Sequence, residues 1–165
     1  MISDPFTQIY NALFSALASD PFLRTFVQPA NRVSWVTENP EPAKTEVSQA
    51  DLPEIQLLPD VLDIDWETTV WIRAIYDFTA QITTGDLRVQ KVLFPVQWGI
   101  VRAISQAGDS LGLPFVQKVR TKMDTNQLND PTVQRGVEGW VSMVKISVEA
   151  RLRYTDLNNN TQPLP

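Results

Sequence analysis

The chain has 165 residues, 43% of them hydrophobic, which is enough for one domain with a core of its own. It carries 14 Lys and Arg against 19 Asp and Glu, and this net charge of −5 disfavours a free-standing nucleic-acid-binding protein, because phosphate binding depends on clustered cations. Cysteine and histidine are absent, which excludes disulfides, thiolate nucleophiles, Ser-His-Asp triads and the commonest metal ligands.

The N-terminal residues predict two consecutive helices. Asp4 followed by Pro5 is a typical helix start, with a capping carboxylate before a proline at the first helical position. Apolar residues then recur at helical spacing as far as Ala18. A second Asp-Pro pair at residues 20–21 predicts a short helix that ends near Phe26.

The next part of the chain predicts three strands separated by loops. Residues 32–37 alternate and indicate a strand, whereas residues 38–53 form a polar loop longer than most connections, which indicates an arm or a functional segment. Residues 54–58 indicate a short strand that Pro59 ends, and residues 67–83 indicate a long one.

The C-terminal half predicts one helix and two further strands. A helix over residues 86–107 is followed by Gly108, a typical helix stop. Pro95 lies inside this span and predicts a kink or two consecutive helices. Residues 116–123 and 136–154 indicate the last two strands.

Two of these strands alternate for longer than a domain of this size needs. Apolar side chains fall on one side of the first at Val70, Ile72, Ala74, Tyr76, Phe78, Ala80 and Ile82, and of the last at Trp140, Val144, Ile146, Val148, Ala150, Leu152 and Tyr154. A strand of about 15 residues spans roughly 50 Å, whereas a globule of this length is about 40 Å across. Strands that outrun their domain leave edges that another chain can cover, so we expect this chain to assemble.

The element order α-β-β-β-α-β-β predicts an α+β fold. We expect a single antiparallel sheet, with mixed pairing possible, and helices packed on one of its faces. Residues 1–155 are expected to form one domain that contains the loop at 38–53, and residues 156–165 a flexible tail.

Acidic residues are concentrated before the first long strand, at Asp60, Asp63, Asp65 and Glu67. Carboxylates in this number could bind a hard cation such as calcium or magnesium. The segment lacks the glycine of an EF-hand loop, however, and it runs directly into a strand. We therefore expect no metal and no cofactor, and interpret the segment as an acidic surface that is solvated or meets a basic partner surface.

Basic and aromatic residues supply the candidate interface. Lys118, Arg120 and Lys122 share one face of a strand, where they could be solvated, line the lumen of a ring or meet the acidic segment of a neighbouring subunit. Trp35, Trp98 and Trp140 fit core positions, whereas the other tryptophans could be covered by a neighbour or by the loop at 38–53. The predicted interface residues are Trp66, Trp71, Arg73, Lys118, Arg120, Lys122, Arg151 and Arg153.

Several short motifs follow one another in a recognisable order. They are Ala18-Ser19-Asp20-Pro21 after the first helix, Leu52-Pro53-Glu54-Ile55 before a short strand, Thr84-Gly85-Asp86-Leu87-Arg88 after a long strand, a helix ending at 104–108, and Gly139-Trp140-Val141-Ser142 before the last strand. Over residues 5–155, this order and spacing resemble the tail-terminator (tail-completion, neck) proteins of long-tailed bacteriophages. The resemblance implies a sheet flanked by helices and a hexameric ring on the last ring of the tail tube. Such a ring stops tube polymerisation and gives the head connector its docking surface.

The expected function is therefore that of a structural virion protein and not of an enzyme. The resemblance implies assembly in the host cytoplasm, a place in the tail or neck, and three partners: further copies of the chain, the tail-tube protein and a head-completion or neck connector protein. Genomic DNA would only pass through the lumen, and no membrane is involved, since no apolar run reaches the length of a membrane span. Two alternatives are another minor tail or baseplate adaptor, and a carboxylate-based hydrolase with two acids about 5 to 9.5 Å apart.

Overall fold

The structure is a computed structural model that describes residues 4–34, 52–86, 88, 90–123 and 139–153. Its elements are α1 (Pro5–Ser19), two short 3-10 turns (Leu23–Thr25 and Pro29–Asn31), β1 (Arg32–Ser34), β2 (Glu54–Trp66), β3 (Trp71–Thr84), α2 (Leu93–Ala107), β4 (Val116–Met123) and β5 (Trp140–Arg153). The strands form one sheet in the order β1-β2-β3-β5-β4, in which β1 pairs parallel with β2 and all other pairs are antiparallel. The predicted α+β fold is confirmed.

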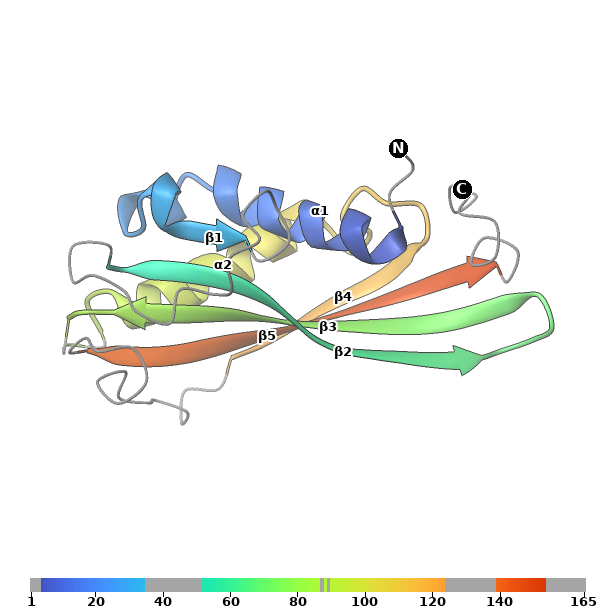
Figure 1. Ribbon diagram of the computed structural model, residues 1–165. Coiled ribbons are helices and arrows are strands. Elements are labelled where there is room, and N and C mark those ends of the chain that lie inside the picture. Colours follow the sequence, from blue (N-terminus) through green and yellow to red (C-terminus); the bar gives the residue numbers. More distant parts are fainter. Residues whose placement is uncertain (1–3, 35–51, 87, 89, 124–138, 154–165) are drawn as a thin grey trace.

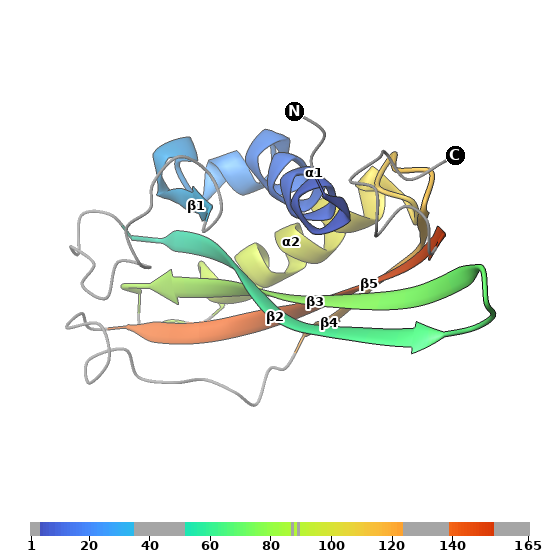
Figure 2. The same cartoon turned by 45° about the vertical axis from the view of Figure 1, so that its right-hand side comes forward.

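Both helices cover the same face of the sheet (Figures 1 and 2). The face they cover is apolar because β3 and β5 alternate, and every second side chain from Ile72 to Ile82 and from Val144 to Leu152 is buried. The helices contribute Ile9, Tyr10, Leu13 and Leu17 from α1, and Leu93, Val96, Ile100, Ala103 and Ile104 from α2. Toward its hairpin end, the pair β2 and β3 continues beyond the helices (Figure 1).

Local contacts explain where α1 lies. The Asp4 carboxylate accepts a hydrogen bond from the Thr7 backbone N–H at 2.8 Å and so caps the helix, as predicted from the sequence. At the other end, the buried Arg32 guanidinium donates to the Leu17 carbonyl at 2.8 Å. The Tyr10 hydroxyl donates to the Leu57 carbonyl of β2, which holds the middle of the helix against the sheet.

The strand β2 differs from the prediction, because it continues through Pro59 to Trp66. Proline is tolerated on an edge strand, and the register of β2 against β3 shifts between Pro59 and Leu62, so a bulge absorbs the irregularity. Except for Glu67, which lies in the turn that follows, the acidic segment expected before a long strand is therefore part of β2 itself. The long strand β3 starts at Trp71, not at residue 67.

The helix α2 also differs from the prediction, because it begins at Leu93 and not at residue 86. Pro95 consequently lies in the first turn of the helix. Backbone N–H groups in this turn have no acceptor within the helix, so a proline costs no hydrogen bond there and the predicted kink is not needed. The core position predicted for Trp98 is wrong, since this side chain is 57% exposed, whereas Trp140 is partly buried against the core. Some of the predictions fall on residues that the structure does not describe. These are residues 35–37, which include Trp35, the loop at 38–51, residues 124–138 and the tail at 154–165.

Candidate functional site

The face of the sheet that lies away from the helices is charged. Antiparallel partners share a face, and the register places Asp65 of β2, Arg73 of β3 and Arg151 of β5 opposite one another. The next row on this face joins Asp63, Ile75, Glu149 and Lys118. We call this surface the open face.

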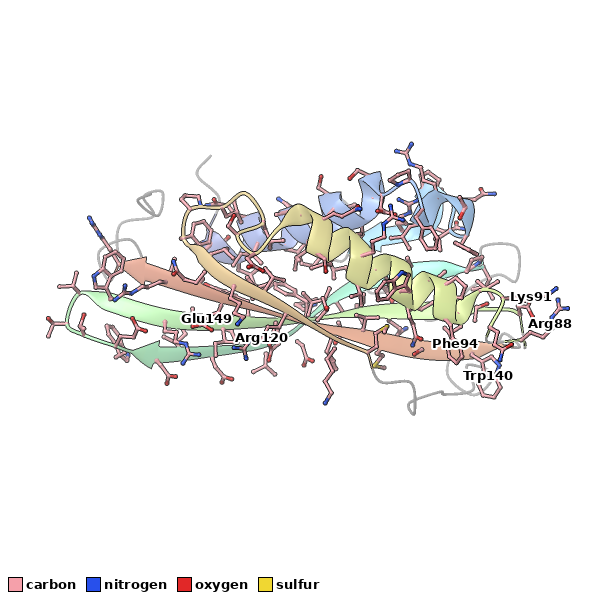
Figure 3. The ribbon with its side chains drawn as sticks, turned by 180° about the vertical axis from the view of Figure 1, so that it is seen from behind. Arg88, Lys91, Phe94, Arg120, Trp140 and Glu149 are labelled. Atoms are coloured by element: carbon pink, nitrogen blue, oxygen red, sulfur yellow. The ribbon has the colours of Figure 1, made fainter. Side chains whose placement is uncertain are left out.

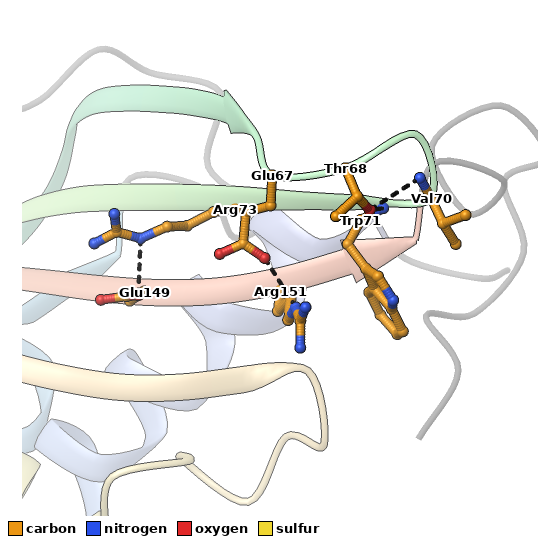
Figure 4. Close-up of polar contacts among 7 residues, drawn as sticks. All are labelled: Glu67, Thr68, Val70, Trp71, Arg73, Glu149 and Arg151. Carbon is orange, nitrogen blue, oxygen red and sulfur yellow. Dashed lines mark hydrogen bonds and ion pairs between the residues drawn. The ribbon is translucent and has the colours of Figure 1, made fainter.

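Three ion pairs connect the strands across the open face. Arg73 Nε lies 2.8 Å from Glu149 Oε1, and Arg151 Nε lies 3.0 Å from Glu67 Oε2 (Figure 4). A third pair joins Lys145 Nζ and Asp60 Oδ2 at 2.7 Å, and the Lys145 ammonium also donates to the Thr79 hydroxyl. Two acids of the segment at 60–67 are therefore neutralised by basic residues of the same chain.

These contacts shift the pKa values of the groups involved. The hydrogen bond from Lys145 lowers the pKa of Asp60, and the hydrogen bond to Glu149 raises the pKa of Arg73. Both groups lie at the surface, where water screens their charges, so the ion pairs add little to the free energy of unfolding. Their main effect is to fix the positions of the side chains on the open face.

Trp71 lies on the open face at the start of β3, in the position predicted from the alternation. The guanidinium carbons of Arg151 and Arg153 lie 4.8 and 5.1 Å from the centre of its ring. Arginine over a tryptophan face is a favourable cation–π arrangement. Two arginines of the same chain therefore cover this tryptophan in part, and four predicted interface residues (Trp71, Arg73, Arg151 and Arg153) come together at the hairpin end of the open face.

The basic residues of β4 form a separate row along one edge of the sheet. Lys118, Arg120 and Lys122 are all exposed and, within the part of the chain that the structure describes, form no ion pair. Figure 3 shows Arg120 near Glu149, whose carboxylate is occupied by Arg73. Arg120 and Lys122 also line an open pocket of about 470 Å³, together with Asp60, Asp77, Lys145 and Ser147.

The described residues contain no group of three or more acidic side chains close enough to hold a metal ion. The reason is the strand itself, which spaces alternate side chains on one face about 7 Å apart. Asp60 and Glu67 have moreover already found cationic partners.

The open pocket also offers little support for hydrolysis by paired carboxylates. A glycosidase needs one carboxyl group that keeps its proton, which requires a raised pKa. The pKa of Asp60 is instead lowered by Lys145. This carboxylate is suited to holding a cation and not to donating a proton.

Reasoning from the sequence named Trp66 as an interface residue but missed the apolar row that it forms with Leu62 and Ile64 on the other face of β2. Leu62, Ile64 and Trp66 are paired with Tyr76, Ala74 and Ile72, so they point to the helix side of the sheet. They lie in the part of the hairpin that the helices do not cover, and they remain 46%, 48% and 62% exposed. The strict alternation of Leu62-Asp63-Ile64-Asp65-Trp66 was the signal that could have revealed this row.

A second exposed apolar surface lies at the other end of the molecule. Phe94 and Trp98, one turn apart on α2, are 37% and 57% exposed. Figure 3 shows Arg88 and Lys91 near Phe94 and the partly buried Trp140. Aromatic and arginine side chains are enriched at the centres of protein interfaces, so this patch is a second candidate docking surface.

No protein-family model matches the chain, and no curated protein matches it. None of the described helices has both the length and the apolar character needed to cross a membrane. The candidate functional site is therefore defined by the geometry of the sheet alone.

Proposed function

We propose that the chain is a structural protein that forms a ring at the head-proximal end of a phage tail tube, where it ends tube polymerisation and offers a docking surface to the head or neck. The observation that carries this proposal is the β2–β3 hairpin, which continues beyond the helices and carries an apolar row whose members are about half exposed. The order of sequence motifs supplies the specific assignment to the tail.

The exposed row supports assembly because it is costly in an isolated subunit. Burying a Leu or Ile side chain completely contributes about 1.5–3 kcal/mol, and roughly half of each side chain in the row remains exposed. The exposed atoms are contiguous along one strand instead of being scattered over the surface, which is the pattern of an interaction site.

The two apolar surfaces also support the proposed position between two partners. The hairpin row and the patch around Phe94 and Trp98 lie at opposite ends of the molecule, so a ring subunit could contact its own copies with one and a different protein with the other. A terminator needs both kinds of contact, since it must close on itself and bind the tube.

Two measurements test the proposal: the mass of the oligomer and the capping of tail tubes. Multi-angle light scattering of the purified chain, alone and with tail-tube protein from the same genome, should give a closed oligomer, most simply a hexamer. Added to polymerising tube protein, the chain should yield short tubes that carry a ring at one end in negative-stain micrographs.

The outcomes separate the alternatives. A monomer at every concentration, also in the presence of tube protein, would contradict the ring. Rings that form but leave tube length unchanged would favour another minor tail or baseplate adaptor.

A further inference from the structure

The sheet has two long edges that no described strand covers. β1 pairs with β2 only from Ile55 to Leu57, so the outer edge of β2 over residues 58–65 has no partner strand in the described part of the chain. At the other side of the sheet, β5 is the one partner of β4 among the described strands. Unpaired edges of this length are templates for pairing with another chain.

The two edges carry opposite charges on the same face of the sheet. Asp63 and Asp65 project from β2 onto the open face, and Lys118, Arg120 and Lys122 project from β4 onto the same face. Neither Asp63 nor Arg120 forms an ion pair with a described residue. Among the described residues, Asp63 and Arg120 therefore carry charge that no ion pair neutralises, and the two edges are complementary.

The helix side of the two edges is also complementary, because it is apolar on both. β2 presents Leu62 and Ile64 there, and β4 presents the half-buried Val119 and the exposed Met123. In one antiparallel register, Asp63 lies opposite Arg120 and Asp65 lies opposite Lys118. The same register places Ile64 opposite Val119, because each step forward along one strand is a step back along its partner. One register thus satisfies the charged row and the apolar row together.

Strand direction and length fit the same arrangement. Successive neighbours from β2 through β3 and β5 to β4 are antiparallel, so β4 of one copy would meet β2 of an equally oriented copy in the same alternation. The free edge of β2 and the 8 residues of β4 are similar in length. Because the contact joins two different edges, it is head-to-tail, and repeating it closes into a ring if the rotation per subunit allows.

We infer that β4 of one subunit pairs with the outer half of β2 of the next, so that the ring is one continuous sheet held by Asp63 and Asp65 against Lys118 and Arg120. The inference rests on the ring of the proposed function and adds to it the partner, which is a second copy of this chain, and the residues in contact. The edge charges then have a role beyond keeping two exposed strands soluble.

Charge reversal on each edge tests the pairing. Asp63→Lys and Arg120→Glu are suitable because the residues opposite them within the subunit, Ile75 and Ser147, are uncharged. Each variant alone should need at least tenfold more protein to form rings, as like charges would then meet at every contact. Mixed in equal amounts, the two variants should co-assemble, because each contact then joins opposite charges again.

Matched controls carry the same charge changes away from both edges. Asp109→Lys, in the turn after α2, and Arg24→Glu, in the 3-10 turn Leu23–Thr25, are exposed positions that should leave assembly as in the wild type. Sedimentation velocity measures the oligomer, and thermal melting of each variant confirms that the subunit remains folded.

Three outcomes distinguish the possibilities. Wild-type rings that tolerate both edge reversals would overturn the edge pairing but leave the proposed ring intact. Variants that assemble normally but no longer cap tubes would assign the β2 edge to the tube protein and would also overturn it. A wild-type chain that never forms rings would contradict the proposed function itself.

Discussion

Replacing Leu62 and Ile64 together by threonine tests whether the apolar row of β2 drives assembly. Both side chains point to the helix side of the sheet in the part of the hairpin that the helices leave uncovered. Threonine is β-branched, as strands favour, but carries a hydroxyl and one methyl group in place of the larger alkyl groups of leucine and isoleucine. The variant therefore removes apolar surface while preserving the strand that carries it.

The expected loss of association free energy follows from the exposure of the two side chains. Leu62 is 46% exposed and Ile64 is 48% exposed, so roughly half of the burial energy of each remains available to a partner. With about 1.5–3 kcal/mol for complete burial, each contributes about 1 kcal/mol to a contact. Losing both removes about 2 kcal/mol per contact, which weakens association about 30-fold.

The subunit itself should survive the change. The buried half of the two side chains contributes up to about 3 kcal/mol to folding, less than the 5–15 kcal/mol that is typical of a natural domain. Urea unfolding should therefore show a lower but measurable free energy of unfolding. The variant should remain folded while its oligomer dissociates.

Sedimentation velocity over a dilution series measures the effect. The matched control is Val70→Thr, which replaces a methyl group with a hydroxyl on a residue that is 52% exposed but lies in the turn between β2 and β3, outside the row. The control should assemble like the wild type. If the double variant also sediments like the wild type down to the lowest concentration, the row is not part of the contact between subunits, and the reasoning from its exposure fails.

Two further predictions concern pH and metals. Burial, with a smaller contribution from Asp4, raises the pKa of Tyr76 to about 12; the unfolded chain then ionises first, near pH 10, and stability falls as the pH rises from about 10 to 12. Urea unfolding of Tyr76→Phe should therefore show a shallower alkaline loss than the wild type, and equal slopes would refute the shifted pKa. EDTA should leave the melting temperature unchanged, because the described residues hold no metal-binding cluster, whereas a drop of several degrees that calcium reverses would reveal a site.

Much of the fold was predictable from short-range patterns in the sequence. The alternation of β3 and β5 identified both strands and assigned Trp71, Arg73 and Arg151 to the face away from the core, because side chains in a strand alternate irrespective of what covers them. The cap at Asp4 and the stop at Gly108 likewise depend on residues within one turn of the helix ends.

The length of β2 could be predicted only in part. Pro59 is a local signal against a strand, and it outweighed the alternation that follows it. Only the sheet shows that β2 lies at an edge at this point, where the missing N–H of a proline is tolerated and a bulge restores the register. The acidic residues thus became strand residues with defined neighbours.

The tertiary structure alone decided which apolar side chains are covered and which charges are paired. Leu62 and Phe78 lie on the same face of neighbouring strands, yet one is 46% exposed and the other 0%. Phe78 packs against Phe6 and Tyr10 of α1, whereas Leu62 lies on the edge strand, beyond the residues that pair with β1. Likewise, Asp60 meets Lys145 across 85 residues of sequence, whereas Arg120 finds no partner among the described residues. Alternation is a property of the strand and is present in the sequence. The burial of an apolar side chain and the pairing of a charge depend instead on elements far apart along the chain.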